Sequence, residues 1–243
     1  MIHRRFFIKP ENIGKENVDI IDKDDIQHIS VLRLKEKDNI IVLDGCGNEY
    51  SVVITSMAQD VIKGKIVEII IHPPTQIELT LVQALPKLNK MDLVISKCTE
   101  LGVTRIIPVE TQRSINLKDK SKRLSRWKRI AKSSSSQSMK VEIPIINPIT
   151  DILTSLELIG EIDLGLIFYE NATRLLRTVL NRSSELKKVA IFIGPEGGFA
   201  HQEVMQIEAK GFIPVSLGPN LLRCETAPIV AVSILLYELG VIG

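Results

Sequence analysis

Aromatic residues are scarce in this chain of 243 residues: they make up 4% of it, whereas 44% of the residues are hydrophobic. The core must therefore consist mainly of Ile, Leu and Val. No run of 18 or more uncharged apolar residues occurs, which argues against a membrane-spanning helix. The first residues, MIHRRF, lead into a predicted strand and lack a signal-peptide pattern, so we expect a cytoplasmic protein.

Metal-binding residues are also few. The three cysteines, Cys46, Cys98 and Cys224, are far apart and odd in number, which indicates neither a disulfide framework nor a zinc site. The four histidines do not have the spacing of metal ligands. We therefore expect no metal.

The two common nucleotide-binding motifs, G-x-x-x-x-G-K-[ST] and G-x-G-x-x-G, are absent. Two other glycine-containing stretches follow apolar runs instead: IGPEGGF at residues 193–199 and LGPNLLRCETA at residues 217–227. Glu196 lies inside the first stretch and would repel phosphate. This loop suits a neutral or cationic ligand with an adenosine part better than a triphosphate.

The net charge of +2 says little about partners, but its distribution says more. Residues 118–132 contain eight Lys or Arg and one acid, a local charge of +7. A solvated helix face is one interpretation. The concentration of charge, with Trp127 embedded in it, favours a surface that binds a polyanion.

The N-terminal part has the pattern of a small β-barrel. A helix is predicted at residues 24–34, and Asp44-Gly45 is a strong hairpin-turn signal. Strands are predicted at residues 3–8, 40–43, 50–54 and 64–71. Because His72-Pro73-Pro74 interrupts the pattern, we place the domain boundary there, giving domains 1–72 and 73–243.

The second domain alternates strands with helices, which predicts an α/β domain around a mostly parallel sheet. Serines 133–136 fit either a loop or a helix end. The predicted strands are 78–85, 105–110, 163–169, 188–193 and 212–217. The predicted helices are 90–101, 121–139, 149–159, 173–183, 200–210 and 225–239.

Ligands of open α/β sheets bind beyond the carboxyl ends of the strands. Three predicted strands end in unusual sequence: FYEN at 168–171, GPEGG at 194–198 and LGPN at 217–220. One such loop could be a simple turn, but three indicate a ligand site. The last helix, 228–239, is apolar nearly all round and should be buried in the core or against another subunit. No histidine is near Cys224 in sequence, so we interpret it as a small buried residue and not as a nucleophile.

The stretches IGPEGGF and LGPNLLRCETA, in this order, resemble the SPOUT methyltransferases, and within them the family that methylates uracil N3 in 16S ribosomal RNA. The likeness extends to residues 5–7 (RFF), 28–33 (HISVLR), 44–45, 97–103 (KCTELGV) and 113–114, and so covers nearly the whole chain. It implies a PUA-like RNA-binding β-barrel, then an α/β domain tied in a trefoil knot, a rare exception to unknotted topology. It also implies a homodimer and S-adenosylmethionine bound in the knot loops.

Matching positions then give the expected site residues. Arg223 is expected to stabilise the uracil anion as catalytic residue, while Glu225 or water takes the N3 proton. Cofactor contacts are expected from Phe168, Tyr169, Glu170, Gly194, Glu196, Gly197, Gly198, Leu217, Gly218, Asn220, Leu222, Arg223, Cys224 and Thr226. RNA contacts are expected from Arg4, Arg5, His28, Arg33, Arg113, Lys122, Arg123, Arg126, Arg129 and Lys140.

The chain departs from the family pattern at three positions. Cys224 stands where Thr is usual, Ser136 where an acid is usual, and Lys140 where Arg is usual. Two other functions fit part of the pattern. A knotted transfer-RNA ribose 2′-O-methyltransferase is disfavoured by the barrel and the complete LGPNLLRCETA. A non-catalytic ribosome-assembly factor is disfavoured because both loops are intact.

Overall fold

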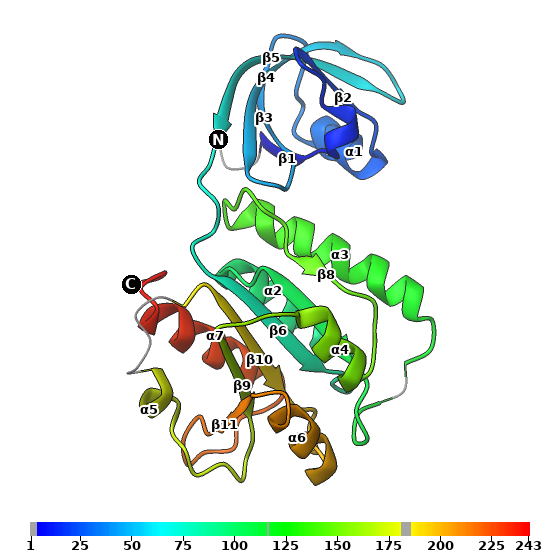
Figure 1. Ribbon diagram of the computed structural model, residues 1–243. Coiled ribbons are helices and arrows are strands. Elements are labelled where there is room, and N and C mark those ends of the chain that lie inside the picture. Colours follow the sequence, from blue (N-terminus) through cyan, green and yellow to red (C-terminus); the bar gives the residue numbers. More distant parts are fainter. Residues whose placement is uncertain (1–3, 116, 181–185) are drawn as a thin grey trace. The chain divides into compact units, whose positions relative to one another are not determined.

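The computed structural model describes residues 4–115, 117–180 and 186–243 (Figure 1). The chain forms two compact units, Met1–Pro74 with Lys132–Ile143, and Thr75–Ala131 with Pro144–Gly243. Residues 132–143, expected in the second domain, are thus grouped with the first unit. Of the helices in the described ranges, none is long and apolar enough to cross a membrane.

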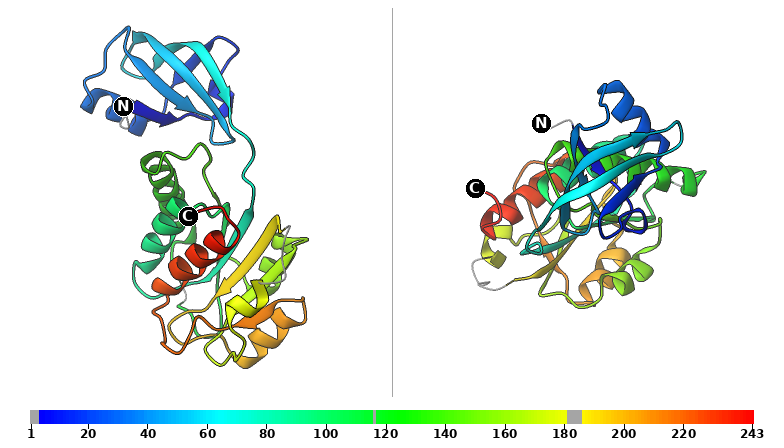
Figure 2. Two further views of the ribbon diagram at one scale, coloured as in Figure 1. Left: turned by 90° about the vertical axis from the view of Figure 1, so that its left-hand side faces the viewer. Right: turned by 90° about the horizontal axis from the view of Figure 1, so that it is seen from above.

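The first unit is a curved five-stranded sheet with strand order β1-β3-β4-β5-β2 and one α-helix, α1 (Figures 1 and 2). β1 pairs with β3 in parallel and the other pairs are antiparallel. The sequence patterns predicted these elements except β2, a strand of four residues. The bounds are β1 Arg5–Phe7, a 3-10 helix Pro10–Asn12, β2 Asn17–Ile20, α1 Lys23–Val31, β3 Asn39–Leu43, β4 Asn48–Met57 and β5 Ile62–Ile71.

Alternating apolar residues build the core of this sheet. Ile40 and Val42 of β3 face the same core as Val52 and Ile54 of β4, since side chains two apart share one face. The predicted Asp-Gly turn joins these strands. The Asp44 carboxylate accepts hydrogen bonds from the backbone N–H of Cys46 at 2.7 Å and of Asn48 at 3.1 Å.

The second unit is built on a six-stranded sheet, order β11-β9-β10-β6-β7-β8, in which every recorded pair is parallel. The short strand β8 was not predicted. The strands are β6 Glu78–Ala84, β7 Arg105–Val109, β8 Ile145–Ile146, β9 Leu164–Phe168, β10 Lys188–Ile193 and β11 Ile213–Val215. The helices are α2 Lys90–Leu101, α3 Lys120–Gln137, α4 Ile152–Ile159, α5 Leu176–Leu180, α6 His201–Glu208 and α7 Thr226–Glu238. The predicted helix 173–183 includes residues 181–183, which lie outside the described residues, as does residue 3 of the first predicted strand.

Helices cover both faces of this sheet: α2 and α7 pack together on one face, and α4 and α6 lie on the other (Figures 1 and 2). Ala190 and Phe192 of β10 join the core beneath α4 and α6, whereas Val189 and Ile191 point to the opposite face and are also buried. Coverage on both sides explains why the central strands are apolar on both faces.

The chain passes close to itself after β11. The backbone N–H of Tyr169 donates to the Val215 carbonyl at 3.1 Å, and the N–H of Ser216 donates to the Arg174 carbonyl at 2.9 Å. Residues 215–216 are therefore hydrogen-bonded to both ends of the segment 169–174, which follows β9. Beyond this point the chain continues as α7, which packs against α2. The trefoil knot implied by the resemblance requires a close passage of this kind.

Helix α3 decides between two interpretations and corrects one expectation. It continues through serines 133–136 and ends at Gln137, so this run is the last turn of the helix and not a loop, and Ser134 and Ser135 in it are buried. Trp127, expected within the polyanion-binding surface, is only 1% exposed. Residues 124, 127 and 131 recur at helical spacing, so Trp127 lies on the inward stripe of the helix and the charges lie around it.

Replacement of Trp127 by alanine should therefore lower the free energy of unfolding by about 3–5 kcal/mol, because it removes a large buried side chain and leaves a cavity. Urea denaturation followed by circular dichroism measures this change. A loss below about 1 kcal/mol, the size typical of a surface substitution, would contradict the burial of Trp127.

Candidate functional site

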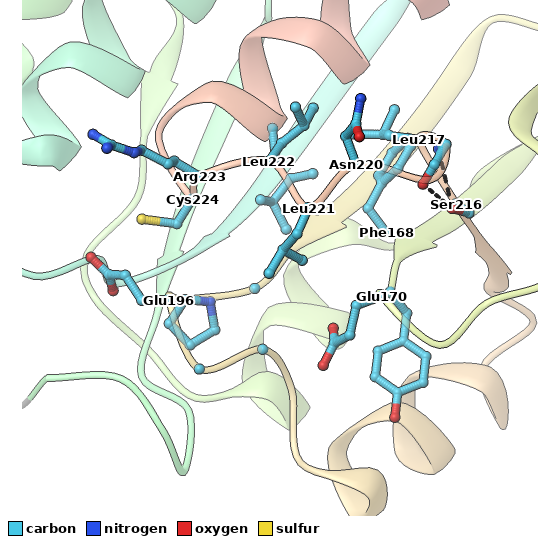
Figure 3. A pocket seen from close by; sticks show the side chains of 18 of the residues that line it. Phe168, Glu170, Glu196, Ser216, Leu217, Asn220, Leu221, Leu222, Arg223 and Cys224 are labelled. Carbon is cyan, nitrogen blue, oxygen red and sulfur yellow. Dashed lines mark hydrogen bonds between the residues drawn. The ribbon is translucent and has the colours of Figure 1, made fainter.

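A pocket lies where the carboxyl ends of β9, β10 and β11 meet, as expected for a parallel α/β sheet (Figure 3). Its volume is about 710 Å³, in the range of cofactor and drug-sized ligands. The lining includes every predicted cofactor contact except Thr226, namely Phe168, Tyr169, Glu170, Gly194, Glu196, Gly197, Gly198, Leu217, Gly218, Asn220, Leu222, Arg223 and Cys224. Thr226 is exposed at the first position of α7.

Two positions of the loop 194–198 have little room for a side chain, because neighbouring groups lie where a Cβ atom would be. Gly198 has a φ of +68°, and a Cβ there would meet the carboxylate of Glu170, with Oε2 at 2.9 Å. A Cβ on Gly194 would lie 3.3 Å from the Phe199 ring. The loop can therefore place its backbone groups against a ligand, and the Glu170 carboxylate packs next to Gly198.

Arg113 holds this loop from outside. Its guanidinium donates to the Gly197 carbonyl at 2.8 Å and to the Phe199 carbonyl at 3.5 Å. A Cβ on Gly197 would contact the Arg113 side chain at 3.3 Å. Arg113, predicted to bind RNA, thus also supports the pocket wall.

Lys90, at the start of α2, lines the pocket and was missed by sequence reasoning. Its ammonium forms ion pairs with Glu196 at 3.0 Å and Glu225 at 3.2 Å. Both hydrogen bonds raise the pKa of Lys90 above its ordinary value. Burial acts to raise the pKa of Glu196, but the bonds from Lys90 and from the backbone outweigh it and hold that pKa below its usual value.

The contacts of Glu225 argue against its expected role as proton acceptor. Its carboxylate does not line the pocket and accepts a hydrogen bond from the Cys224 thiol at 3.2 Å in addition to its pair with Lys90. Burial acts to raise the pKa of Glu225, but hydrogen bonds from the backbone, Cys224 and Lys90 hold it below its ordinary value. A carboxylate so engaged is a poor proton acceptor.

Cys224 is buried, in agreement with the interpretation of it as a small core residue. Burial raises the pKa of its thiol to about 12, and the neighbouring Glu225 and Glu196 carboxylates add to the rise. The thiol therefore stays protonated near neutral pH and is not a nucleophile.

Arg223 is exposed at the pocket, and the structure describes no hydrogen bond or ion pair for its guanidinium. Figure 3 shows this guanidinium pointing away from Leu221 and Leu222, on the side of the pocket opposite Glu170. The group is thus accessible to a ligand at the edge of the pocket.

Arg5 is a correction among the predicted RNA contacts. Its side chain is 5% exposed and pairs with Glu49 at 3.3 Å, so it cannot meet RNA in this conformation. Glu49 also lies 3.2 Å from His72.

The other predicted RNA contacts of the first unit differ in exposure. Arg4, His28 and Arg33 are exposed; His28 packs edge-on against Phe6, with 5.4 Å between ring centroids. Lys140 is half-buried, and this burial lowers its pKa.

The basic residues of 118–132 fall into two sets. In the partnered set, Lys120 pairs with Glu110, Arg126 with Asp92 and Lys132 with Asp25, and Arg123 donates to the Asn89 side chain. In the free set, the structure describes no side-chain hydrogen bond or ion pair. The free set comprises Lys118, Lys122, Lys128 and Arg129, all exposed.

Within residues 4–115, 117–180 and 186–243, no three His, Cys, Asp or Glu side chains gather into a group that could hold a metal ion. The expected absence of a metal stays a prediction.

Comparisons with known proteins agree with this architecture. Residues 73–236 match the RNA methyltransferase domain family, and residues 21–67 match the RNA methyltransferase PUA domain family. "Ribosomal RNA small subunit methyltransferase E" of Synechocystis sp. is 32% identical, over 94% of this chain and 76% of that protein. The protein of the same name from Mesomycoplasma hyopneumoniae is 32% identical, over 93% of this chain and 95% of its own length.

Solved structures give the same result. A ribosomal RNA small subunit methyltransferase E from Neisseria gonorrhoeae, bound to S-adenosyl methionine, has a TM-score of 0.85 and 30% identity, covering 96% of this chain and 97% of that one. A methyltransferase from Legionella pneumophila with bound cofactor SAM has a TM-score of 0.85 and 26% identity over the same shares. The prediction of a PUA-like domain followed by a SPOUT-type domain with a parallel sheet is confirmed. The chain belongs to the RNA methyltransferase family.

Proposed function

We propose that the protein uses S-adenosylmethionine to methylate N3 of a uridine in 16S ribosomal RNA of the small subunit. The observation that carries this proposal is the pocket formed at three adjacent strand ends by the loops 168–170, 194–198 and 217–224. Two solved relatives of similar fold hold S-adenosylmethionine. Small-subunit ribosomal RNA is the substrate class in the names of the relatives.

The pocket suits this cofactor on its own chemistry. Its glycine loop lets backbone groups approach the ligand, and its volume of about 710 Å³ accommodates a nucleoside with an amino-acid tail. Glu170 faces the pocket (Figure 3), and the described residues include no ion-pair partner for it. An unneutralised carboxylate favours a ligand with positive charge over a phosphate. The cofactor-contact set we propose is therefore the thirteen predicted residues that line the pocket, without Thr226. Glu196 and Arg223 belong to this set through their backbone, since the Glu196 carboxylate pairs with Lys90 and the Arg223 guanidinium points away from Leu221 and Leu222.

When bound, S-adenosylmethionine supplies an electrophilic methyl group on a sulfonium. The protein must then hold uracil N3 in line with that methyl, since positioning is the main contribution to such a displacement. Arg223 donates hydrogen bonds to a uracil carbonyl oxygen and stabilises the charge that develops as N3 loses its proton. Because Glu225 is engaged by Lys90 and Cys224, we assign the N3 proton to solvent water. The target base must lie in a loop or be flipped out to reach this site.

Titration of S-adenosylmethionine into the purified protein tests the cofactor assignment. Saturable binding is expected. The alternative of a non-catalytic ribosome-assembly factor predicts no heat of binding in the same calorimetric experiment.

We assign RNA binding to residues 1–72 and to the free set, which lies on α3 and just before it, and methyl transfer to residues 73–243. Replacing the four residues of the free set by glutamine should flatten the salt dependence of RNA binding. Its log–log slope should fall by about 3, at roughly 0.7 per phosphate contact. The matched control is the partnered set, Lys120, Arg123, Arg126 and Lys132, whose replacement should change the slope by less than about 1. Equal effects of the two sets would remove the distinction between them.

We also propose a homodimer through the C-terminal unit, acting in the cytoplasm. Helix α7 buries one face in the core, but Ile234 and Tyr237 on another face are 37% and 65% exposed. Apolar residues placed on one helix face suit contact with a second copy. A monomer in light scattering at micromolar concentration would contradict this proposal.

A further inference from the structure

Lys90 stands where two loops of the pocket meet. Its Nζ lies 3.0 Å from Glu196 Oε1 in the loop 194–198, and 3.2 Å from Glu225 Oε2 at the start of α7. The Cys224 sulfur is 3.8 Å from the same ammonium. One cation thus joins the loop after β10 to the loop after β11.

Among the residues that the structure describes, no other Lys, Arg or His forms an ion pair with Glu196 or Glu225. Both side chains are partly withdrawn from water, 27% and 14% exposed. Without the ammonium, two like charges would converge at the rim of the pocket, in surroundings that screen them incompletely.

Lys90 is well placed to hold both loops, because it sits at the end of a fixed helix. The first turn of α2 is anchored by α3: Arg126 pairs with Asp92 at 2.8 Å, and Arg123 donates to Asn89 at 3.2 Å. Next to Lys90, the backbone N–H of Lys87 donates to Glu196 at 3.0 Å. The strand-end loop is therefore fastened at two points to the segment 87–90.

We propose that Lys90 is a positioning residue that ties the loop 194–198 to the Cys224–Glu225 step and so holds the cofactor pocket in its binding shape. The inference rests on the proposed function. In this inference Lys90 neutralises the Glu196 carboxylate, and Glu170 remains as the pocket carboxylate that faces a cationic ligand.

Replacement of Lys90 by methionine should raise the dissociation constant for S-adenosylmethionine about 10-fold, since the two carboxylates then repel each other across the rim. A second change, Glu196→Gln, should reverse this loss in the Lys90→Met background and bring affinity back to within about 3-fold of the wild type. The same Glu196→Gln change in the wild-type protein should not improve binding. Lys97→Met is the matched control: Lys97 lies on the same helix, pairs with Glu100 at 2.8 Å and is outside the pocket lining, so affinity should not change.

Calorimetry with S-adenosylmethionine gives the affinities of the wild type and of these four variants. Methyl transfer to isolated small subunits separates KM from kcat: a positioning role raises the KM for the cofactor and leaves kcat within about 3-fold at saturation. Thermal unfolding checks that each variant is folded. If Lys90→Met does not fold, Lys90→Arg still tests the inference, because an arginine can pair with both carboxylates and should bind within about 3-fold of wild type.

Unchanged affinity in Lys90→Met would overturn the inference while leaving the proposed function intact. So would a folded Lys90→Met protein whose loss Glu196→Gln does not relieve, because Lys90 would then contact the cofactor itself. A loss of S-adenosylmethionine affinity above 10-fold in Lys90→Arg would also overturn the inference. A wild-type protein that binds no S-adenosylmethionine would overturn the proposed function, and this inference with it.

Discussion

Replacement of Arg223 by alanine is expected to slow methyl transfer about 10²- to 10³-fold, the loss typical of removing one donor to a developing oxyanion. Affinity for S-adenosylmethionine should change by less than about 3-fold, because the guanidinium points away from Leu221 and Leu222 and forms no hydrogen bond or ion pair with the described residues. The expected pattern is a loss of kcat at nearly constant cofactor affinity. Single-turnover transfer of labelled methyl to small ribosomal subunits measures it.

Arg223→Lys separates charge from geometry. Lysine keeps the positive charge but lacks the planar fork of donors, so a rate between those of wild type and Arg223→Ala is expected. Near-normal turnover in Arg223→Ala would remove Arg223 from the chemical step. A parallel loss of cofactor binding would instead show that the Arg223 guanidinium itself contacts the cofactor.

Replacement of Gly198 by alanine is expected to weaken S-adenosylmethionine binding about 10- to 100-fold, because the added methyl group displaces the Glu170 carboxylate that fills this position. Part of the change in stability will come from the backbone, since a left-handed conformation costs an L-residue about 1–2 kcal/mol. A control must separate this backbone strain from the effect of the clash between the new methyl group and Glu170.

Gly211 provides the matched control. Its φ of +87° imposes the same kind of backbone strain, but a Cβ there would meet nothing within 4 Å. Gly211→Ala should therefore lose similar stability in thermal unfolding and keep full cofactor affinity. If Gly198→Ala binds S-adenosylmethionine as tightly as Gly211→Ala does, the wall formed by residues 170 and 198 is not part of the cofactor site.

The pattern of apolar residues was sufficient to predict most of the fold, because both units bury regular strands and helices. It missed β2 and β8, which have four and two residues, too few for a period to be detected. Trp127 could have been placed in the core from its helical spacing with Leu124 and Ala131. The basic residues around Trp127 led to the prediction that it lies on the surface.

The loops of the site could be predicted from local sequence, but the contacts between them could not. Glu196 and Lys90 are 106 residues apart, and Arg5 and Glu49 are 44 apart. No local pattern indicates which lysine will neutralise a loop carboxylate, or that an arginine in a strand will be buried against one. Two such long-range pairs, Lys90 with Glu225 and Arg5 with Glu49, argue against the roles expected of Glu225 and Arg5.

The central claim is best tested by incubating the protein with isolated small ribosomal subunits and labelled S-adenosylmethionine, then digesting the RNA and mapping the methyl group by mass spectrometry. We predict one methyl group on N3 of a uracil in 16S ribosomal RNA. A methyl group on a ribose 2′-oxygen, or no transfer by a protein that is folded and binds the cofactor, would contradict the account.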